Sequence, residues 1–238
     1  MNDKKEITRI LKKMGEYFDW VNVDRKEYLS PSDFDLGNKR YETVGKDNDL
    51  LRALQDLLSN EWKGCRIIFL GDECEAPQDV ATDLFQTIQK HSEELGYSGE
   101  DMYEMIWESY KDVAGLFKAA EDDVREEIRI YLERLKEGDS SAVNEYGIDI
   151  DDPYKGLFLR AGKTFKYTIN HTKKVAYSLD KTKILYQNGE MCKSVDPLPI
   201  LMGYGRSLKP GVWLGDIISV DDILPEGYTL IPEIHLDW

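Results

Sequence analysis

The chain has 238 residues, of which 41% are hydrophobic and 32% are charged, and its formal net charge is −15. This composition predicts a folded protein with one large or two small cores, and the negative charge disfavours binding to nucleic acids and to anionic membranes. The sequence contains no apolar stretch of about 18 residues and no signal-like segment after its charged start. The three cysteines follow no pairing or metal-binding pattern. We therefore expect a soluble cytoplasmic protein with free thiols.

The first third of the sequence predicts one helix and a small β-rich unit. Apolar residues at helical spacing predict an amphipathic helix over residues 3–15 that docks on the domain. Aromatic and β-branched residues predict two short strands over 17–28, around a turn at 22–26. Leucines at helical spacing predict a helix over 49–60, and residues 66–70 have the pattern of a buried strand. The order of this unit is therefore strand–strand–helix–strand.

The middle of the sequence is acidic and helical. Residues 72–152 carry 24 acidic and 7 basic side chains, so all of the excess negative charge lies there. Apolar spacing predicts helices over 77–95, 98–117 and 122–136, followed by a linker over 138–163. Such charge either keeps a helical face in solvent or speeds the encounter with a basic partner.

The last third of the sequence returns to a β-rich pattern. Alternating and β-branched residues predict strands over 164–170, 174–179, 183–187, 213–220 and 228–236. Pro197 and Pro199 permit at most a short helix between these strands.

Two sequence motifs occur twice, 148 to 151 residues apart. One places an asparagine shortly before a pair of basic residues, and the other is a Trp-x-Gly turn that leads into an apolar run. The repeated residues are Asn22, Arg25, Lys26, Trp62, Gly64, Asn170, Lys173, Lys174, Trp213, Gly215 and Asp216. These residues either set turns and anchor the core or contribute to a site.

The repeated motifs predict an α+β fold that contains two related β-rich strand–strand–helix–strand modules. The modules span residues 1–72 and 153–238, and they flank an acidic helical insert and linker over residues 73–152. Two related modules can pack about a pseudo-twofold axis and leave a groove at their junction.

These motifs resemble an uncharacterised family of small bacterial proteins. Its first half reads like Val-Asn-Leu-Asp-Lys-Lys-Glu-Tyr-Leu-x-Pro and its second like Trp-Ala-Gly-Asp-Arg-Ile-x-Ile-x-Gly-Asp. The matching segments are 21–31 and 62–72, with a second match at 169–174 and 213–218. The first copy has a cysteine, at position 65, in place of the usual aspartate. The resemblance supports the duplication and implies no activity, although such proteins are often accessory proteins paired with toxins or phage systems.

Residue spacing gives little support for catalysis or metal binding. The three histidines are scattered, and no Cys-x-x-Cys or His-x-x-x-His pair occurs, so we predict no metal and no cofactor. The sequence has no Gly-x-Ser-x-Gly motif, and no histidine falls in a recognisable arrangement with a serine or cysteine. We leave enzymatic activity open and favour a protein without it.

We therefore interpret the chain as a non-enzymatic acidic binding protein, an immunity-type inhibitor or antagonist of a basic bacterial or phage effector. The residues expected to contact this basic protein partner are acids of the helical insert: Glu100, Asp101, Glu104, Glu108 and Asp112. One alternative is a small-ligand-binding protein or enzyme that uses the groove between the modules, with the polar groups Asp72, Tyr204, Arg206, Asp216 and Asp221. Another is a structural or assembly subunit with an exposed apolar patch. The oligomeric state is left open.

Overall fold

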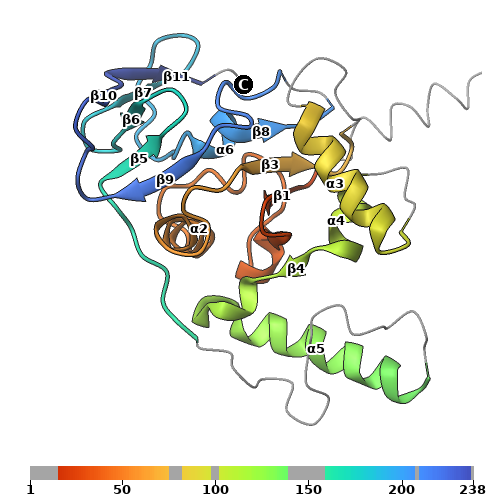
Figure 1. Cartoon of the computed structure of the whole chain (residues 1–238). Helices are drawn as coiled ribbons and strands as arrows, with labels where there is room; N and C mark the ends of the chain where they lie inside the picture. The colour runs from red at the N-terminus through yellow and green to blue at the C-terminus, as the bar shows by residue number, and fades with distance from the viewer. Residues whose placement is uncertain (1–15, 75–81, 98–101, 139–158, 207–208, 237–238) are drawn as a thin grey trace, which may run out of the picture.

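The computed structural model describes residues 16–74, 82–97, 102–138, 159–206 and 209–236 (Figure 1). The predicted helix over residues 3–15 and most of the predicted linker lie outside these ranges. Within them the protein has the α+β fold that the sequence predicts. Among the helices of the described ranges, none combines the length and the apolar content needed to cross a membrane.

The described residues form three β-sheets (Figure 1). The first has the spatial order β4-β2-β1-β3-β8, the second β10-β6-β5-β9, and the third β11-β7. The strands are β1 (Phe18–Asn22), β2 (Glu27–Leu29), β3 (Ile67–Gly71), β4 (Lys111–Asp112), β5 (Tyr167–Asn170), β6 (Val175–Tyr177), β7 (Lys183–Leu185), β8 (Gly203–Tyr204), β9 (Ile218–Asp221), β10 (Thr229–Leu230) and β11 (Glu233–His235).

Five α-helices and three short 3₁₀ helices lie in the described ranges. They are α2 (Asp49–Ser59), α3 (Thr82–Glu94), α4 (Met102–Ser109), α5 (Glu121–Lys136), α6 (Leu198–Met202), η1 (Pro31–Phe34), η2 (Ala114–Leu116) and η3 (Lys118–Ala120). Asn48 caps α2 by accepting a hydrogen bond from the Leu51 backbone amide. α6 is short because Pro199 lies within it and Pro197 precedes it.

Four strands of the first sheet and the four strands of the second share order, direction and register. β1 pairs antiparallel with β2 and β3, and β5 pairs antiparallel with β6 and β9. Asn22 faces Ile67 across this pairing, as Asn170 faces Ile218. β4 adds to β2 in parallel, as β10 adds to β6. The repeated sequence motifs therefore lie at equivalent positions of two four-stranded sheets.

The connection between the last two strands differs between the sheets. In the first sheet α3 and α4 connect β3 to β4 and cover one face of the sheet (Figure 1). In the second sheet residues 222–228 make the same connection. Two of the predicted acidic helices therefore pack on the first sheet, whose edge strand lies at residues 111–112. The helix predicted over 98–117 is wrong at its end, because α4 stops at Ser109 and the chain then pairs with β2.

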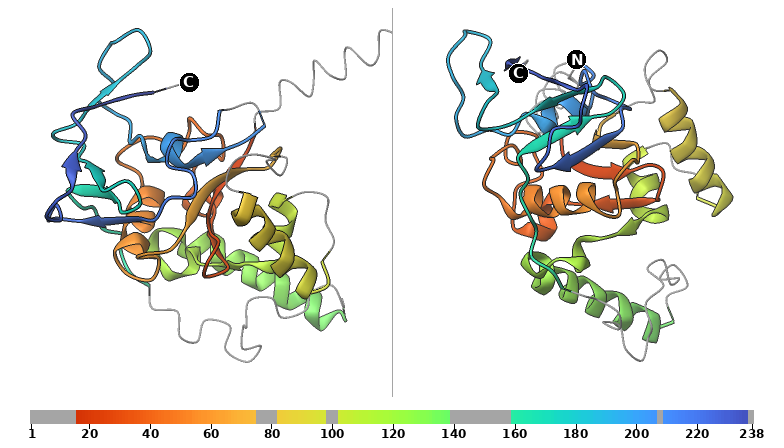
Figure 2. Two further views of the ribbon diagram at one scale, coloured as in Figure 1. Left: turned by 45° about the horizontal axis from the view of Figure 1, so that its top comes forward. Right: turned by 60° about the vertical axis from the view of Figure 1, so that its left-hand side comes forward.

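The two sheets meet through reciprocal contacts. Gly45 forms an antiparallel bridge with Val195, and Arg66 forms one with Ile217, so the paired residues are 150 and 151 positions apart. α2 packs against β9, and α6 packs against β3. Figure 2 shows the orange α2 beside the teal and blue strands of the second sheet. The helix of each half thus packs on the third strand of the other half's sheet. Such reciprocal contacts are those expected about a local pseudo-twofold axis.

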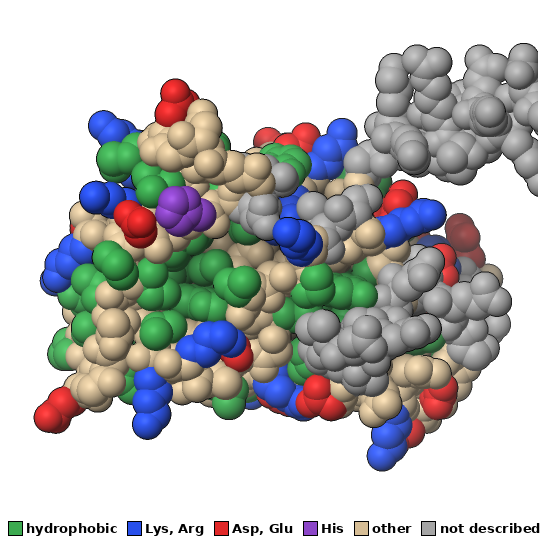
Figure 3. Space-filling model, turned by 90° about the horizontal axis from the view of Figure 1, so that it is seen from above, with side chains coloured by type: hydrophobic (Ala, Val, Ile, Leu, Met, Phe, Trp, Pro, Cys, Tyr) green, Lys and Arg blue, Asp and Glu red, His purple; other side chains and the backbone are tan. Residues whose placement is uncertain are grey.

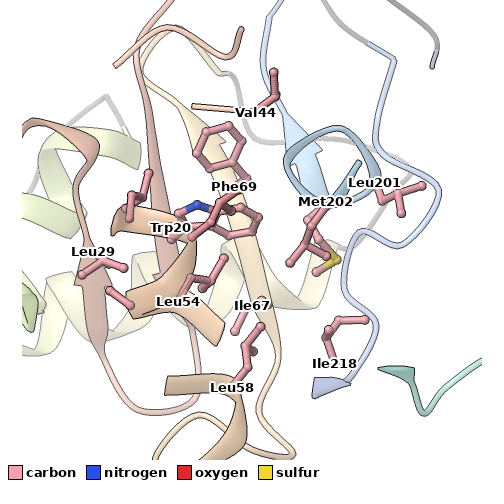
Figure 4. Close-up of a cluster of buried hydrophobic side chains, with 14 of the residues drawn as sticks. Trp20, Leu29, Val44, Leu54, Leu58, Ile67, Phe69, Leu201, Met202 and Ile218 are labelled. Carbon is pink, nitrogen blue, oxygen red and sulfur yellow. The ribbon is translucent and has the colours of Figure 1, made fainter. Parts of the chain in front are cut away.

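One hydrophobic core lies between the two sheets (Figure 4). The rings of Trp20 in β1 and Phe69 in β3 pack against each other with centroids 4.6 Å apart and an interplanar angle of 33°. Leu54 of α2, Met202 of α6 and Ile218 of β9 join them, and all five side chains are fully buried. Each such side chain contributes about 1.5–3 kcal/mol on burial. The two halves of the chain therefore depend on each other for their core.

A second core lies between the first sheet and the helices α3 and α4. It contains Val21, Val23, Tyr28, Ile68, Leu70, Cys74, Leu84, Phe85, Ile88, Met102, Met105, Ile106 and Tyr110. The alternation of β1 explains both cores, because its side chains point in turn to α2 and to α4. α4 is consequently held on the sheet by one face and presents its other face to solvent.

Candidate functional site

In the second sheet the repeated motif residues form a buried clasp between the β5–β6 turn and the turn before β9. Asn170 is fully buried, and its Oδ1 accepts a hydrogen bond of 2.9 Å from the Lys173 backbone amide. Its Nδ2 donates to Asp216 Oδ2 at 2.7 Å, and Lys173 Nζ donates to the same carboxylate. Gly215, with φ of 79°, gives the turn before Asp216 its left-handed conformation. The clasp therefore links two turns through one asparagine and one carboxylate.

In the first sheet the clasp keeps the asparagine but lacks the carboxylate. Asn22 is also fully buried, and its Oδ1 accepts a hydrogen bond of 3.0 Å from the Arg25 backbone amide. The residue equivalent to Asp216 is Cys65, and Asn22 Nδ2 has no hydrogen-bond partner among the described residues. Arg25 forms an ion pair of 2.9 Å with Glu27 instead. The two clasps therefore differ in two side chains, Arg25 in place of Lys173 and Cys65 in place of Asp216.

The other repeated residues fit a structural role. Lys26 and Lys174 have φ of 59° and 54°, so both hairpin turns close through a left-handed residue. Trp62 and Trp213 are buried in the shared core. Trp62 Nε1 also donates a hydrogen bond of 2.8 Å to Glu27 Oε2. The geometry supports the interpretation that the repeated motif fixes turns and anchors the core.

The exposed side of α4 presents an aromatic residue between two acids. Glu104 and Glu108 are exposed, Trp107 is 46% exposed, and α4 contains no basic residue. Trp107 Nε1 donates a hydrogen bond of 2.7 Å to Asp19 Oδ2. The Tyr103 ring lies 5.5 Å from the indole ring, centroid to centroid. We call Glu104, Trp107 and Glu108 the α4 surface; the hydrogen bond holds its indole in one orientation.

Of the remaining acids that the sequence predicts for partner binding, Asp112 lies within the described residues, and it does not join the α4 surface. Glu100 and Asp101 lie outside the described residues. Asp112 lies in β4, and its Oδ1 accepts a hydrogen bond of 2.7 Å from the Ala114 backbone amide. This bond gives Asp112 a structural role at the start of η2.

Asp19 is a buried acid that the sequence analysis did not single out. It lies in β1 beneath α4, and burial raises its pKa from 3.8 to about 6, although hydrogen bonds from Trp107 and Ser30 offset part of this effect. A carboxylate between buried residues of a strand is an unusual sequence signal. Its partner, however, is 88 residues away in the sequence, which no local pattern reveals.

A pocket of about 300 Å³ lies where the end of α2 meets the segment before β5 and the end of β9. It is lined by Ser59, Asn60, Lys63, Lys163, Phe165, Val220, Asp221 and Asp222. Of the five polar groups predicted for a groove between the modules, only Asp221 lines this pocket. Asp216 belongs to the clasp, and Tyr204 packs on Phe85 with ring centroids 5.0 Å apart.

The other two predicted groove residues lie near the start of β1. Asp72 Oδ1 accepts a hydrogen bond of 2.9 Å from the Tyr17 backbone amide. Glu16 Oε1 accepts one of 2.8 Å from the Arg206 backbone amide. Burial raises the pKa of Glu16, and Asp72 raises it further. The predicted groove residues are therefore divided among four places in the fold.

The structure also brings together a histidine and a serine that sequence spacing does not connect. His171 Nε2 lies 2.7 Å from Ser219 Oγ, and His171 Nδ1 lies 3.0 Å from Tyr228 Oη. Ser219 is only 2% exposed, so its hydroxyl is shielded from a substrate. Burial lowers the pKa of His171, and the charge of Lys63 lowers it further. We assign this group to the packing of the second sheet.

Among the described residues, no group of three or more His, Cys, Asp or Glu side chains is placed to hold a metal ion.

The surface of the protein carries exposed hydrophobic side chains. On the face seen from above, they gather in areas bordered by charged ones (Figure 3). The exposed hydrophobic residues include Met191, Val212 and Ile223.

Comparison with known proteins leaves the function open. No protein-family model matches the chain, no curated protein matches its sequence, and no solved structure matches its fold.

Proposed function

We propose that this protein is a non-enzymatic binding protein whose α4 surface engages a basic protein partner, in the manner of an immunity-type inhibitor in the bacterial cytoplasm. The observation that supports this function best is the half-exposed Trp107, fixed by Asp19 and flanked by Glu104 and Glu108. Tryptophan is among the residues that contribute most to protein–protein binding.

The rigidity of Trp107 favours binding. An immobilised side chain at an interface costs about 0.5–1.5 kcal/mol of conformational entropy on association. Because the indole is already held by the hydrogen bond to Asp19 and by the neighbouring Tyr103 ring, most of this cost is paid during folding.

The charges of the α4 surface favour a basic partner. Glu104 and Glu108 are one helical turn apart, and both point to solvent beside Trp107. Acids at the rim of an interface accelerate the encounter with a positively charged protein and weaken its complexes with acidic proteins. The excess of acids in this part of the sequence acts in the same direction.

The test is affinity capture of the tagged full-length protein from its host lysate, at low and at physiological salt. The double variant Glu104→Lys/Glu108→Lys should lose a basic partner that the wild type retains. The matched control is Glu190→Lys/Glu226→Lys, which makes the same change in net charge at exposed acids far from α4 in sequence. Equal capture by both double variants would contradict the proposal.

A second candidate function is small-ligand binding in the pocket at the end of α2. The observation that favours it is that charged side chains of both signs line this pocket: Lys63, Lys163, Asp221 and Asp222. Such a site suits a small zwitterionic molecule. A thermal-shift screen of amino acids would test this candidate, and a response that Lys63→Ala abolishes would support it.

The shared strand order and the reciprocal contacts also support the duplication. We propose that residues 16–113 and 167–231 are two copies of one module, joined by α5 and the segment that follows it, and that the ancestral protein was a homodimer of this module. The family resemblance is part of the same proposal.

A further inference from the structure

The two clasps differ at two positions, and the exchange of an aspartate for a cysteine leaves a buried polar atom without a partner. Asn22 and Asn170 are both 0% exposed, and each accepts backbone hydrogen bonds through Oδ1. Asn170 Nδ2 donates to Asp216, two positions before β9, whereas Asn22 Nδ2 has no acceptor among the described residues. Cys65, two positions before β3, holds the place equivalent to Asp216.

The residue at that position in the first sheet is Cys65, a free and partly exposed thiol. Arg25, the equivalent of Lys173, is paired with Glu27 at 2.9 Å. The first clasp therefore has a buried amide donor without an acceptor and a cysteine at the equivalent position, where the second has a buried amide donor bound to a carboxylate.

We propose that Cys65 is a site of oxidation by hydroperoxides, and that oxygen atoms added to its Sγ complete the first clasp as the carboxylate of Asp216 completes the second. The thiolate attacks one peroxide oxygen, the O–O bond breaks, and the departing hydroxide takes up a proton to leave as water. The product is a sulfenate. A second peroxide repeats the step and gives a sulfinate, whose two oxygens match those of a carboxylate.

The added oxygens stabilise the fold because they accept hydrogen bonds that are missing in the reduced protein. One oxygen accepts from Asn22 Nδ2. A buried donor that gains a charged acceptor stabilises the fold, and the expected rise in Tm for a chain of this size is about 2–12 °C. The sulfenate is reversed by thiols, whereas the sulfinate is not.

The other two cysteines serve as internal controls. Cys74 and Cys192 are buried, with 6% and 4% of their surface exposed. In the folded protein they should react with peroxide more slowly than Cys65, because oxidation requires access to the sulfur. No further variant is needed to compare the three sites.

The experiment treats the full-length protein with increasing hydrogen peroxide and measures the oxidation state of each cysteine by peptide mass spectrometry. Tm is measured on the same samples. We expect Cys65 to gain oxygen about tenfold faster than Cys74 and Cys192, and Tm to rise as it does so. Cys65→Asp should show the higher Tm without peroxide, and Cys65→Ser should show no rise with peroxide.

Two results would overturn the proposal. One is oxidation of Cys74 or Cys192 ahead of Cys65 in the folded protein. The other is a Tm that falls or stays constant when Cys65 alone is oxidised, which would show that Asn22 Nδ2 gains no acceptor. If Cys65→Asp fails to fold, the oxidised wild-type protein still decides between these outcomes.

Discussion

Replacing Asp216 with alanine should destabilise the protein, whereas the equivalent change at Cys65 should not. The Asp216→Ala variant leaves the buried Asn170 Nδ2 without its acceptor at 2.7 Å, and an unsatisfied buried amide costs about 1–3 kcal/mol. The lost pair with Lys173, whose side chain is 45% exposed, adds at most about 1 kcal/mol because solvent screens it. The expected loss is therefore about 1–4 kcal/mol. Cys65→Ala removes no hydrogen bond and should change stability by less than about 1 kcal/mol.

Urea denaturation followed by circular dichroism measures this difference. The two sheets share one core, so a single transition is expected, and Asp216→Ala should lower its midpoint without changing the slope. Asp216→Asn is the control that retains an oxygen acceptor for Asn170, and it should lose less than alanine does. Equal losses for Asp216→Ala and Cys65→Ala would refute the equivalence of the two clasps, and so would an alanine variant as stable as the wild type.

Three further predictions follow from single contacts. Asp19 has a folded-state pKa raised from 3.8 to about 6, so its ionisation destabilises the fold. This loss of folding stability is absent below about pH 4, grows as pH rises to about 6, and reaches at most about 3 kcal/mol. Asp19→Asn, which still offers an acceptor to Trp107, should therefore be more stable than the wild type at pH 7 and equal to it near pH 4. If urea denaturation gives a difference in the free energy of unfolding that does not depend on pH, this prediction is wrong. Arg160 lies 2.6 Å from the buried carboxylate of Asp56, and Arg160→Leu should lower the free energy of unfolding by about 2–3 kcal/mol. The control Arg129→Leu, on the surface of α5, should change the denaturation midpoint little. Equal losses of stability for the two variants would show that the Arg160–Asp56 pair does not stabilise the fold. Affinity for the partner of the α4 surface should fall between low and physiological salt, and a salt-independent dissociation constant would argue against an electrostatic contribution.

The sequence predicts the α+β class and several short elements because their determinants are local. The turn residues, the Trp-x-Gly segments and the leucines of α2 each fix a short element. β4 is missed because two residues at the edge of a sheet, Lys111 and Asp112, carry no strand pattern. The predicted helix over 98–117 runs too far because Tyr110, Val113 and Phe117 keep a helical spacing although they are buried in two different cores.

The candidate site is predicted only in part. The exposure of Glu104 and Glu108 follows from the apolar face of α4, because Met102, Met105 and Ile106 occupy the opposite side. The anchoring of Trp107 by Asp19 depends on a contact between distant segments, and so do the pairs of His171 with Ser219 and of Asn170 with Asp216. Periodicity predicts which face of an element is buried, and it does not predict which polar groups meet there.

The central claim is that the α4 surface binds a basic protein through Trp107. The measurement that tests it most directly is the dissociation constant of the captured and purified partner for Trp107→Ala, compared with that of the wild type. The control is Ile223→Ala, a substitution at a side chain that is 74% exposed outside α4. We predict that Trp107→Ala, with an unchanged circular dichroism spectrum, weakens binding by about 30-fold or more and that Ile223→Ala leaves it unchanged. Equal affinities for Trp107→Ala and the wild type would contradict the account.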